Sequence, residues 1–243
     1  MNSIFKLNFS KSLLLIFMVM NWPATSAAQT PQDEKPSPHY YERLEIFKKE
    51  SPILPGEFVM LGNSLTENAG NWNKRLQTTN VRNRGIIGDT AFGIYNRLAS
   101  ILEGHPQRIY LMAGINDVSH NLSAKEIVRR IRLIIKRIKE VSPTTEIYLQ
   151  SLLPINESFQ RYRLLNNKTN LIPIINASLK RLSQRYNLHY IDLFPLFTEP
   201  NSLILRKELT TDGLHLNEEG YNIWINELKK TIHTEQNINE PEH

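Results

Sequence analysis

The chain has 243 residues, a formal net charge of +5 and no cysteine. This length is sufficient for one domain with a sizeable core. The lack of cysteine excludes disulfide bonds and cysteine-ligated zinc sites, so the fold must be stabilised by burial of its core alone.

The first 28 residues have the composition of a secretory signal peptide. Lys6 and Lys11 precede the apolar run LLLIFMVM at 13–20, and small residues at 26–28 mark a cleavage point after Ala28. The run is far shorter than the roughly 20 residues of a membrane-spanning helix, and a retained interfacial anchor is the alternative. We therefore expect a secreted or periplasmic mature chain, with no transmembrane span.

Beyond this segment, short apolar runs alternate with helical patterns. We expect helices at 40–50, 91–102, 123–141, 171–186 and 218–233, and strands at 58–61, 81–87, 108–112, 146–151 and 188–193. This alternation predicts an α/β fold with a parallel sheet and helices on both faces. The chain divides into a signal peptide (1–28), a leader with a short helix (29–50), one folded domain (51–235) and a polar tail (236–243).

The predicted helix at 123–141 contains the most basic stretch of the sequence. Ser123 and Glu126 have the spacing of a capping box at its start. Arginines and lysines between 129 and 139 would suit a polyanion or nucleic-acid patch. Isoleucines recur at helical spacing along the same segment, so we favour a solvated face opposite a buried one, and no nucleic-acid partner.

The turns after the predicted strands are where reactive groups of such a sheet gather. Ser64 follows the first strand, where its hydroxyl can face a cleft and its N–H can stabilise an oxyanion. By itself, a serine here is more often a helix N-cap. Gly88 follows the second strand with its N–H available, and the amide of Asn116 after the third strand offers an uncharged donor, worth about 3 kcal/mol in an oxyanion hole.

An Asp-x-x-His pattern stands before the last predicted helix. Asp212 and His215 are separated by Gly213 and Leu214, which lets both side chains lie on one side of a tight loop. The carboxylate could then fix the imidazole tautomer and leave the other ring nitrogen to accept a serine proton. A surface loop with an incidental histidine is the alternative.

The combination and order of these features resemble the SGNH hydrolases, a branch of the GDSL-like esterases and lipases. The matching blocks are Gly62-Asn63-Ser64-Leu65, Gly88, Gly114-Ile115-Asn116-Asp117 and Asp212-Gly213-Leu214-His215. The resemblance implies a flavodoxin-like three-layer α/β/α sandwich with a five-stranded parallel sheet. It implies acyl transfer to the nucleophile Ser64, with His215 as base oriented by Asp212, and no metal or organic cofactor.

The resemblance also implies an oxyanion hole made by the N–H groups of Ser64 and Gly88 and the side-chain amide of Asn116. One departure concerns Asn63, where the family commonly has aspartate; the size is kept and the charge is lost. Asp117 is interpreted as a structural turn residue.

The substrate implied is a small-molecule or glycan ester. Segments 84–90, 150–156, 190–193 and 211–220 resemble secreted bacterial carbohydrate O-acetylesterases that act on sialate or xylan, and the motifs also resemble platelet-activating-factor acetylhydrolase-like esterases. We therefore expect acetyl esters on carbohydrates, with a lipid-directed esterase (a lysophospholipase or an acetylhydrolase of that kind) and a non-catalytic carbohydrate-binding protein as alternatives. Trp72, Phe92 and His120 follow the blocks closely enough to contact substrate, although core packing explains Phe92 equally well. The oligomeric state is not predicted.

Overall fold

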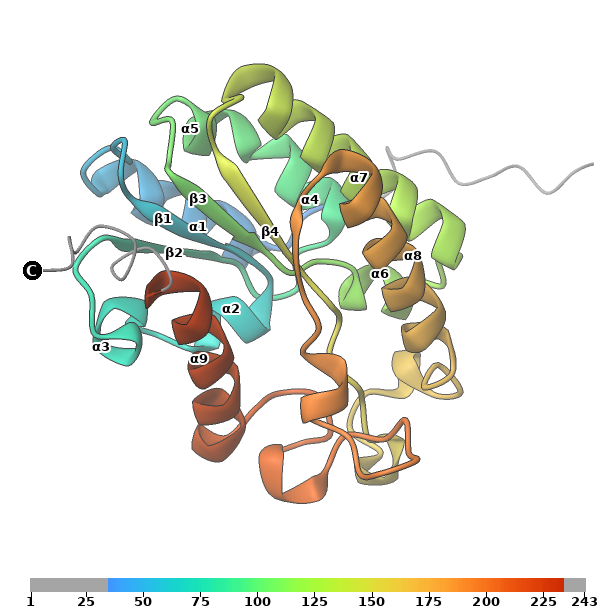
Figure 1. Cartoon of the computed structure of the whole chain (residues 1–243). Helices are drawn as coiled ribbons and strands as arrows, with labels where there is room; N and C mark the ends of the chain where they lie inside the picture. The colour runs from blue at the N-terminus through green and yellow to red at the C-terminus, as the bar shows by residue number, and fades with distance from the viewer. Residues whose placement is uncertain (1–34, 234–243) are drawn as a thin grey trace, which may run out of the picture. The chain divides into compact units, whose positions relative to one another are not determined.

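The computed structural model describes residues 35–233 (Figure 1). The signal peptide predicted at 1–28 and the polar tail at 236–243 lie outside the described residues. The strands are β1 (Phe58–Gly62), β2 (Val81–Gly85), β3 (Arg108–Leu111), β4 (Glu146–Gln150) and β5 (His189–Ile191). The α-helices are α1 (Pro38–Lys49), α2 (Ser64–Asn68), α3 (Trp72–Leu76), α4 (Ala91–Asn96), α5 (Leu98–Leu102), α6 (Ile115–Ser119), α7 (Ala124–Val141), α8 (Leu171–Tyr186) and α9 (Glu218–His233), with short 3₁₀ turns between β4 and α9.

All five strands form one parallel sheet in the order β2-β1-β3-β4-β5. Side chains alternate across the sheet, so Val59 and Leu61 face one cluster of buried apolar residues while Phe58 and Met60 face another. The first cluster includes residues of α4, α5, α7 and α8, and the second includes residues of α2, α3 and α9. Figure 1 shows α3 and α9 on the opposite side of the sheet from α5 and α7. The predicted three-layer, flavodoxin-like α/β fold is confirmed.

The predicted helix at 91–102 is wrong in one respect, because it is divided into α4 and α5 at Arg97. The guanidinium of Arg97 is buried and donates to the Asp89 carboxylate and the Gly62 carbonyl. The strand predicted at 81–87 ends earlier, at Gly85, where the chain turns. A Cβ at Gly85 would collide with the backbone of Glu67, so glycine allows α2 to lie against β2.

Helix α7 has the predicted amphipathic pattern with two corrections. Ser123 accepts the Glu126 N–H as predicted, but the Glu126 carboxylate binds Arg129 and Arg130 and does not complete the capping box. The isoleucines of α7 are buried, and Arg130 lies on the same buried side, 3.3 Å from Asp117. The basic stretch is therefore mostly a solvated helix face, with one structural arginine.

Helix α1 packs onto the domain rather than extending away from it. Tyr40 is buried and its hydroxyl donates to the Gly93 carbonyl in α4. Glu50, directly after α1, accepts from Arg84 of β2 at 2.6 Å. Within residues 35–233, none of the helices combines the length and apolar character needed to cross a membrane.

Candidate active site

Ser64 is the first residue of α2, at the carboxyl end of β1. Asn63 is the N-cap, because its side-chain oxygen accepts the Leu65 N–H. The Ser64 hydroxyl is thus not consumed in capping, and it lies 2.9 Å from Nε2 of His215. Asn63 performs this capping without a charge, so the departure from the family's aspartate leaves the start of α2 intact.

His215 continues the chain of contacts to Asp212. Its Nδ1 lies 2.8 Å from Oδ2 of Asp212, and both side chains are about one-fifth exposed. If Nδ1 carries the hydrogen, it donates to the carboxylate and Nε2 is left to accept from Ser64. The three side chains predicted from sequence therefore form one continuous hydrogen-bonded series, although 151 residues separate Ser64 from His215.

The loop at 210–216, which we call the His215 loop, is held in its conformation mainly by hydrogen bonds between its own residues. The second oxygen of Asp212 accepts the N–H groups of Leu214 and His215, and Thr210 donates its hydroxyl to the His215 carbonyl. Gly213 has φ +89°, and a Cβ there would collide with the Asn156 carbonyl oxygen. Glycine at this position is therefore required for the aspartate and the histidine to face each other.

Tyr162 is a neighbour of this series that the sequence did not reveal. Its hydroxyl donates to Oδ2 of Asp212 at 2.8 Å and lies 3.0 Å from Nδ1 of His215, and its ring meets the imidazole edge to face. Burial and the adjacent Asp212 carboxylate raise the pKa of Tyr162 to about 12, so the phenol remains a donor at neutral pH. Tyr162 stands in no sequence motif, and only its spatial position identifies it.

The carboxylate of Asp212 is held in its ionised form. Burial favours the neutral acid, but hydrogen bonds from the His215 ring, the N–H groups of His215 and Leu214, and Tyr162 outweigh it and lower the pKa of Asp212. A carboxylate that stays ionised can stabilise an imidazolium formed beside it.

The turn at 86–90, which we call the Gly88 turn, lies beyond β2. Gly88 has φ +79° and is exposed, and Asp89 N–H donates to the Ile86 carbonyl across the turn. Asn116, in α6 after β3, donates from its side-chain amide to the Asp89 carbonyl at 2.8 Å. An amide nitrogen has two hydrogens, so this bond fixes the amide and leaves a second hydrogen for a ligand.

Buried charges hold the Gly88 turn in place. Arg97 pairs with Asp89 at 2.8 Å, both side chains being about 2% exposed. Asp117 was interpreted as a turn residue, but it lies inside α6, fully buried, where it accepts the Ala91 N–H and pairs with Arg130. Asp117 therefore joins α6 to α4 and α7. It is a structural residue, as predicted, but it stabilises helix packing and not a turn.

The three residues proposed as substrate contacts differ in position. The prediction for Trp72 is wrong, because its side chain is buried. Its indole N–H donates to the Thr66 carbonyl, and its ring packs edge to face on Trp224. Phe92 is half-buried near the Arg130 guanidinium, and His120 is exposed at the end of α6.

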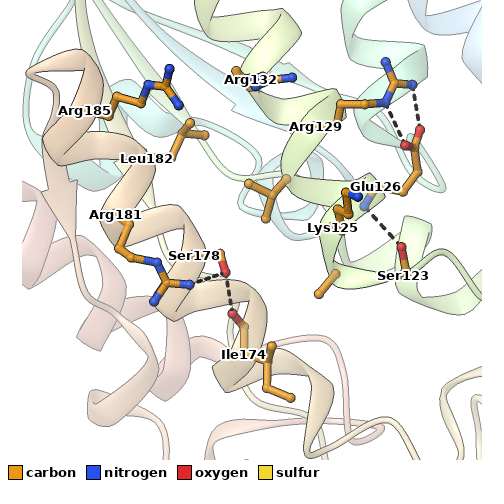
Figure 2. A pocket seen from close by; sticks show the side chains of 12 residues that line it. Ser123, Lys125, Glu126, Arg129, Arg132, Ile174, Ser178, Arg181, Leu182 and Arg185 are labelled. Atoms are coloured by element: carbon orange, nitrogen blue, oxygen red, sulfur yellow. Dashed lines mark hydrogen bonds and ion pairs between the residues drawn. The ribbon is translucent and has the colours of Figure 1, made fainter.

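The larger of two described cavities is not at the catalytic series. It has a volume of about 670 Å³ and lies between α7 and α8, where Arg129, Arg132, Arg181 and Arg185 line it together with apolar side chains such as Leu182 and Ile174 (Figure 2). A cavity of about 10 Å³ beside Asp212 and Tyr162 is the second. Ser64 lines neither of the two. In the described part of the chain, no three histidine, aspartate or glutamate side chains are grouped so that they could hold a metal ion.

Comparison with known proteins gives consistent results. Residues 60–223 match the model of the GDSL-like lipase/acylhydrolase family. The alpha1 subunit of bovine platelet-activating factor acetylhydrolase IB is 25% identical over 180 residues, which cover 72% of this chain and 74% of the relative. A GDSL-like lipase from Bacteroides thetaiotaomicron superposes with a TM-score of 0.69 at 22% identity, covering 81% of this chain and 98% of that one. An acetyl xylan esterase superposes with a TM-score of 0.61 at 20% identity, covering 72% and 98%.

Proposed function

Because the chain belongs to the GDSL-like lipase/acylhydrolase family, we propose that it is a secreted serine esterase that removes short acyl groups, chiefly acetyl, from carbohydrates. The observation that carries the catalytic part is the hydrogen-bonded series of Ser64, His215 and Asp212. The family and its similar structures support a serine ester hydrolase, while the acyl length, the carbohydrate and the secretion are our inference.

The proposed reaction uses the contacts between Ser64, His215 and Asp212. His215 accepts the Ser64 proton at Nε2 as the serine oxygen attacks the ester carbonyl, and Asp212 stabilises the imidazolium. The oxyanion that forms is stabilised by the N–H groups of Ser64 and Gly88 and the amide of Asn116. His215 then gives its proton to the departing alcohol oxygen, and the same residues direct water onto the acyl-serine to release the acid.

A long acyl chain needs an apolar groove that starts at the nucleophile, and Ser64 is on the wall of neither cavity described above. An acetyl group needs no such groove. The structural similarity to an acetyl xylan esterase adds support for an acetyl ester on a sugar.

The test is hydrolysis of p-nitrophenyl esters of increasing chain length and of acetylated xylan and acetylated sialic acid by the full-length secreted protein. We expect acetate to be preferred and acetate to be released from at least one glycan. Ser64→Ala should lose at least about 10⁴-fold in kcat. Turnover of the wild type no faster than that of Ser64→Ala would contradict catalysis, and a preference for long chains would contradict the acetyl specificity alone.

A lipid-directed esterase is the second candidate, because apolar side chains are exposed near both parts of the site. Ile87, next to Gly88, is 43% exposed, and Leu164, two residues from Tyr162, is 64% exposed. The bovine relative's name, platelet-activating factor acetylhydrolase, also favours this candidate. Faster hydrolysis of 2-acetyl phospholipids than of every acetylated glycan would favour this candidate.

A further inference from the structure

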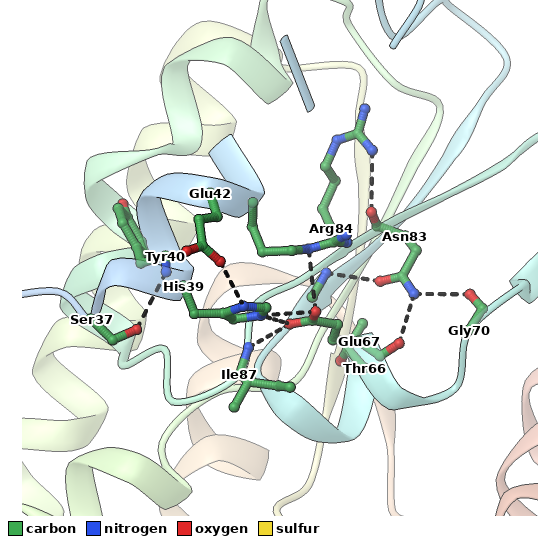
Figure 3. A network of polar contacts seen from close by, with 12 residues as sticks. Ser37, His39, Tyr40, Glu42, Thr66, Glu67, Gly70, Asn83, Arg84 and Ile87 are labelled. Atoms are coloured by element: carbon green, nitrogen blue, oxygen red, sulfur yellow. Dashed lines mark hydrogen bonds and ion pairs between the residues drawn. The ribbon is translucent and has the colours of Figure 1, made fainter. Parts of the chain in front are cut away.

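Glu67 of α2 contacts both α1 and the Gly88 turn, which carries one of the proposed oxyanion donors (Figure 3). It lies three residues after Ser64 in α2, and its side chain is 14% exposed. One carboxylate oxygen accepts the Ile87 N–H at 2.6 Å, directly before Gly88. Both oxygens lie 3.0 Å from Nε2 of His39, and Nε of Arg43 lies 3.3 Å from one of them.

His39 and Arg43 both belong to α1, which precedes the residues that match the family model. Helix α1 is held independently, by the buried Tyr40 near its start and by the pair of Glu50 with Arg84 beyond its end. His39 and Arg43 are therefore presented to Glu67 from a helix with anchors of its own. The four motif blocks of the family do not include any of these contacts.

The bond to Ile87 restricts the Gly88 turn on its exposed side. On the buried side, the turn is already fixed, because Ile86 donates to the Gly62 carbonyl and Asn116 donates to the Asp89 carbonyl. Ile87 and Gly88 are both exposed. Gly88 has a positive φ, and a glycine changes its backbone dihedral angles easily because it has no Cβ. Without Glu67, the peptide groups around Gly88 could reorient, with water as the partner of the Ile87 N–H.

We propose that Glu67 is a positioning residue that aligns the Gly88 N–H for the oxyanion, and that α1 holds the Glu67 carboxylate in place through His39 and Arg43. This inference rests on the proposed esterase function. The physical basis is that a donor stabilises an oxyanion strongly only when it is oriented before the reaction, and that misplacement by about 1 Å can cost roughly 100-fold in rate.

The first experiment compares Glu67→Ala and Glu67→Gln with Glu45→Ala, a control that removes an exposed carboxylate of α1 paired with Lys48. On p-nitrophenyl acetate, we expect Glu67→Ala to lower kcat about 10- to 100-fold with KM nearly unchanged, because the ground-state ester does not use the oxyanion donors. Glu67→Gln retains an acceptor for the Ile87 N–H and should stay within about 3-fold of the wild type. The joint substitution His39→Ala and Arg43→Ala should lower kcat by less than Glu67→Ala.

A double-mutant cycle separates positioning from loss of fold. Asn116→Ala alone should lower kcat about 10²- to 10³-fold. If Glu67 acts on the same oxyanion, the two substitutions together should cost clearly less than the product of their separate effects. Effects that multiply, or an unchanged kcat in Glu67→Ala, would overturn the proposal.

Hydrogen exchange of the Ile87 amide gives a readout that does not depend on turnover. The amide should be protected in the wild type and in Glu67→Gln, and should exchange faster in Glu67→Ala while the amides of β1 remain protected. If the wild type fails to hydrolyse any ester, the proposed function fails while this exchange pattern still holds. Unchanged exchange in Glu67→Ala would overturn the proposed restraint of the Gly88 turn by Glu67.

Discussion

The His215 loop and the Gly88 turn carry the proposed base and a proposed oxyanion donor, and they are held in place in different ways. The His215 loop makes most of its bonds within itself, and its carboxylate, Asp212, is partly exposed and has a lowered pKa. The Gly88 turn is held by side chains from three other segments, namely Glu67 of α2, Arg97 directly before α5, and Asn116 of α6. Its carboxylate, Asp89, is almost fully buried, and burial outweighs the attraction of Arg97 and raises the pKa to about 6.

The contrast indicates a division of tasks. Proton transfer by His215 requires that the neighbouring Asp212 carboxylate stay ionised, and hydrogen bonds within one loop keep it so. Stabilisation of the oxyanion needs donors that do not move, and contacts from several elements of the packed domain provide that. We therefore expect substitutions in the His215 loop to affect chemistry with little loss of stability, and substitutions around the Gly88 turn to affect both.

The largest effect is expected for Asp212→Asn. Asparagine can still accept the N–H groups of Leu214 and His215, so the loop should keep its shape. Its amide favours the wrong tautomer of His215 and cannot stabilise the imidazolium, so kcat on p-nitrophenyl acetate should fall about 10⁴-fold.

The control for this substitution is the melting temperature, which should stay close to that of the wild type. A loss of activity below 10-fold would mean that Asp212 does not orient the base. A large fall in melting temperature would mean that the His215 loop contributes to stability as much as the Gly88 turn does, and the contrast would be lost.

Arg97→Met tests the other side of the comparison. It removes the partner of a buried carboxylate, and the free energy of unfolding in urea should fall by about 3–5 kcal/mol at pH 7. The loss should be smaller at pH 5. An aspartate whose pKa is raised in the folded state binds its proton there first, so stability increases as pH falls through that pKa, and the increase is greater without Arg97.

Arg137→Met is the matched control, because Arg137 is exposed on α7. It should change the free energy of unfolding by less than about 0.5 kcal/mol at either pH. A loss in Arg97→Met that is the same at pH 5 and pH 7 would show that the protonation of Asp89 is not linked to folding.

The same contrast explains how much could be predicted from sequence. The sheet and the long helices were predictable, since apolar periodicity is a local property and needs only the residues of one segment. The Asp212 and His215 pair was predictable for the same reason, because both residues and Gly213 belong to one short loop. Ser64 was correctly placed after a strand, although its contact with His215 could only be inferred from the order of the family's blocks.

The contacts that fix the Gly88 turn could not be predicted. The bond of Glu67 to Ile87 and that of Asn116 to Asp89 join segments 20 and 27 residues apart, and no spacing rule relates them. Arg130 follows the charge pattern of a solvated face, yet it is buried because Asp117 from another helix meets it. Charged residues that find a partner only in the folded chain leave no signal in hydrophobic periodicity.

The smallest effect is expected for Tyr162→Phe, which removes the hydroxyl that donates to Asp212 from outside the His215 loop. The hydroxyl donates to a carboxylate that also accepts from His215 and from two backbone N–H groups, and water can replace it because Tyr162 is 36% exposed. We expect kcat to fall severalfold, far less than in Asp212→Asn, with KM on p-nitrophenyl acetate unchanged. A fall of more than about 100-fold would place Tyr162 among the residues essential for proton transfer.

The pH dependence of this variant follows from the lowered pKa of Asp212. A carboxylate whose pKa is depressed in the folded state stabilises the protein above its ordinary pKa of about 3.9 and loses that contribution as pH falls through the depressed value. Tyr162 is one of the donors that depress it, so Tyr162→Phe should melt slightly below the wild type at pH 7. The difference should shrink as the pH falls through the depressed pKa, below which the carboxylate is protonated in both proteins. A difference that does not shrink on acidification would show that the hydroxyl does not stabilise the protein through its bond to the ionised Asp212.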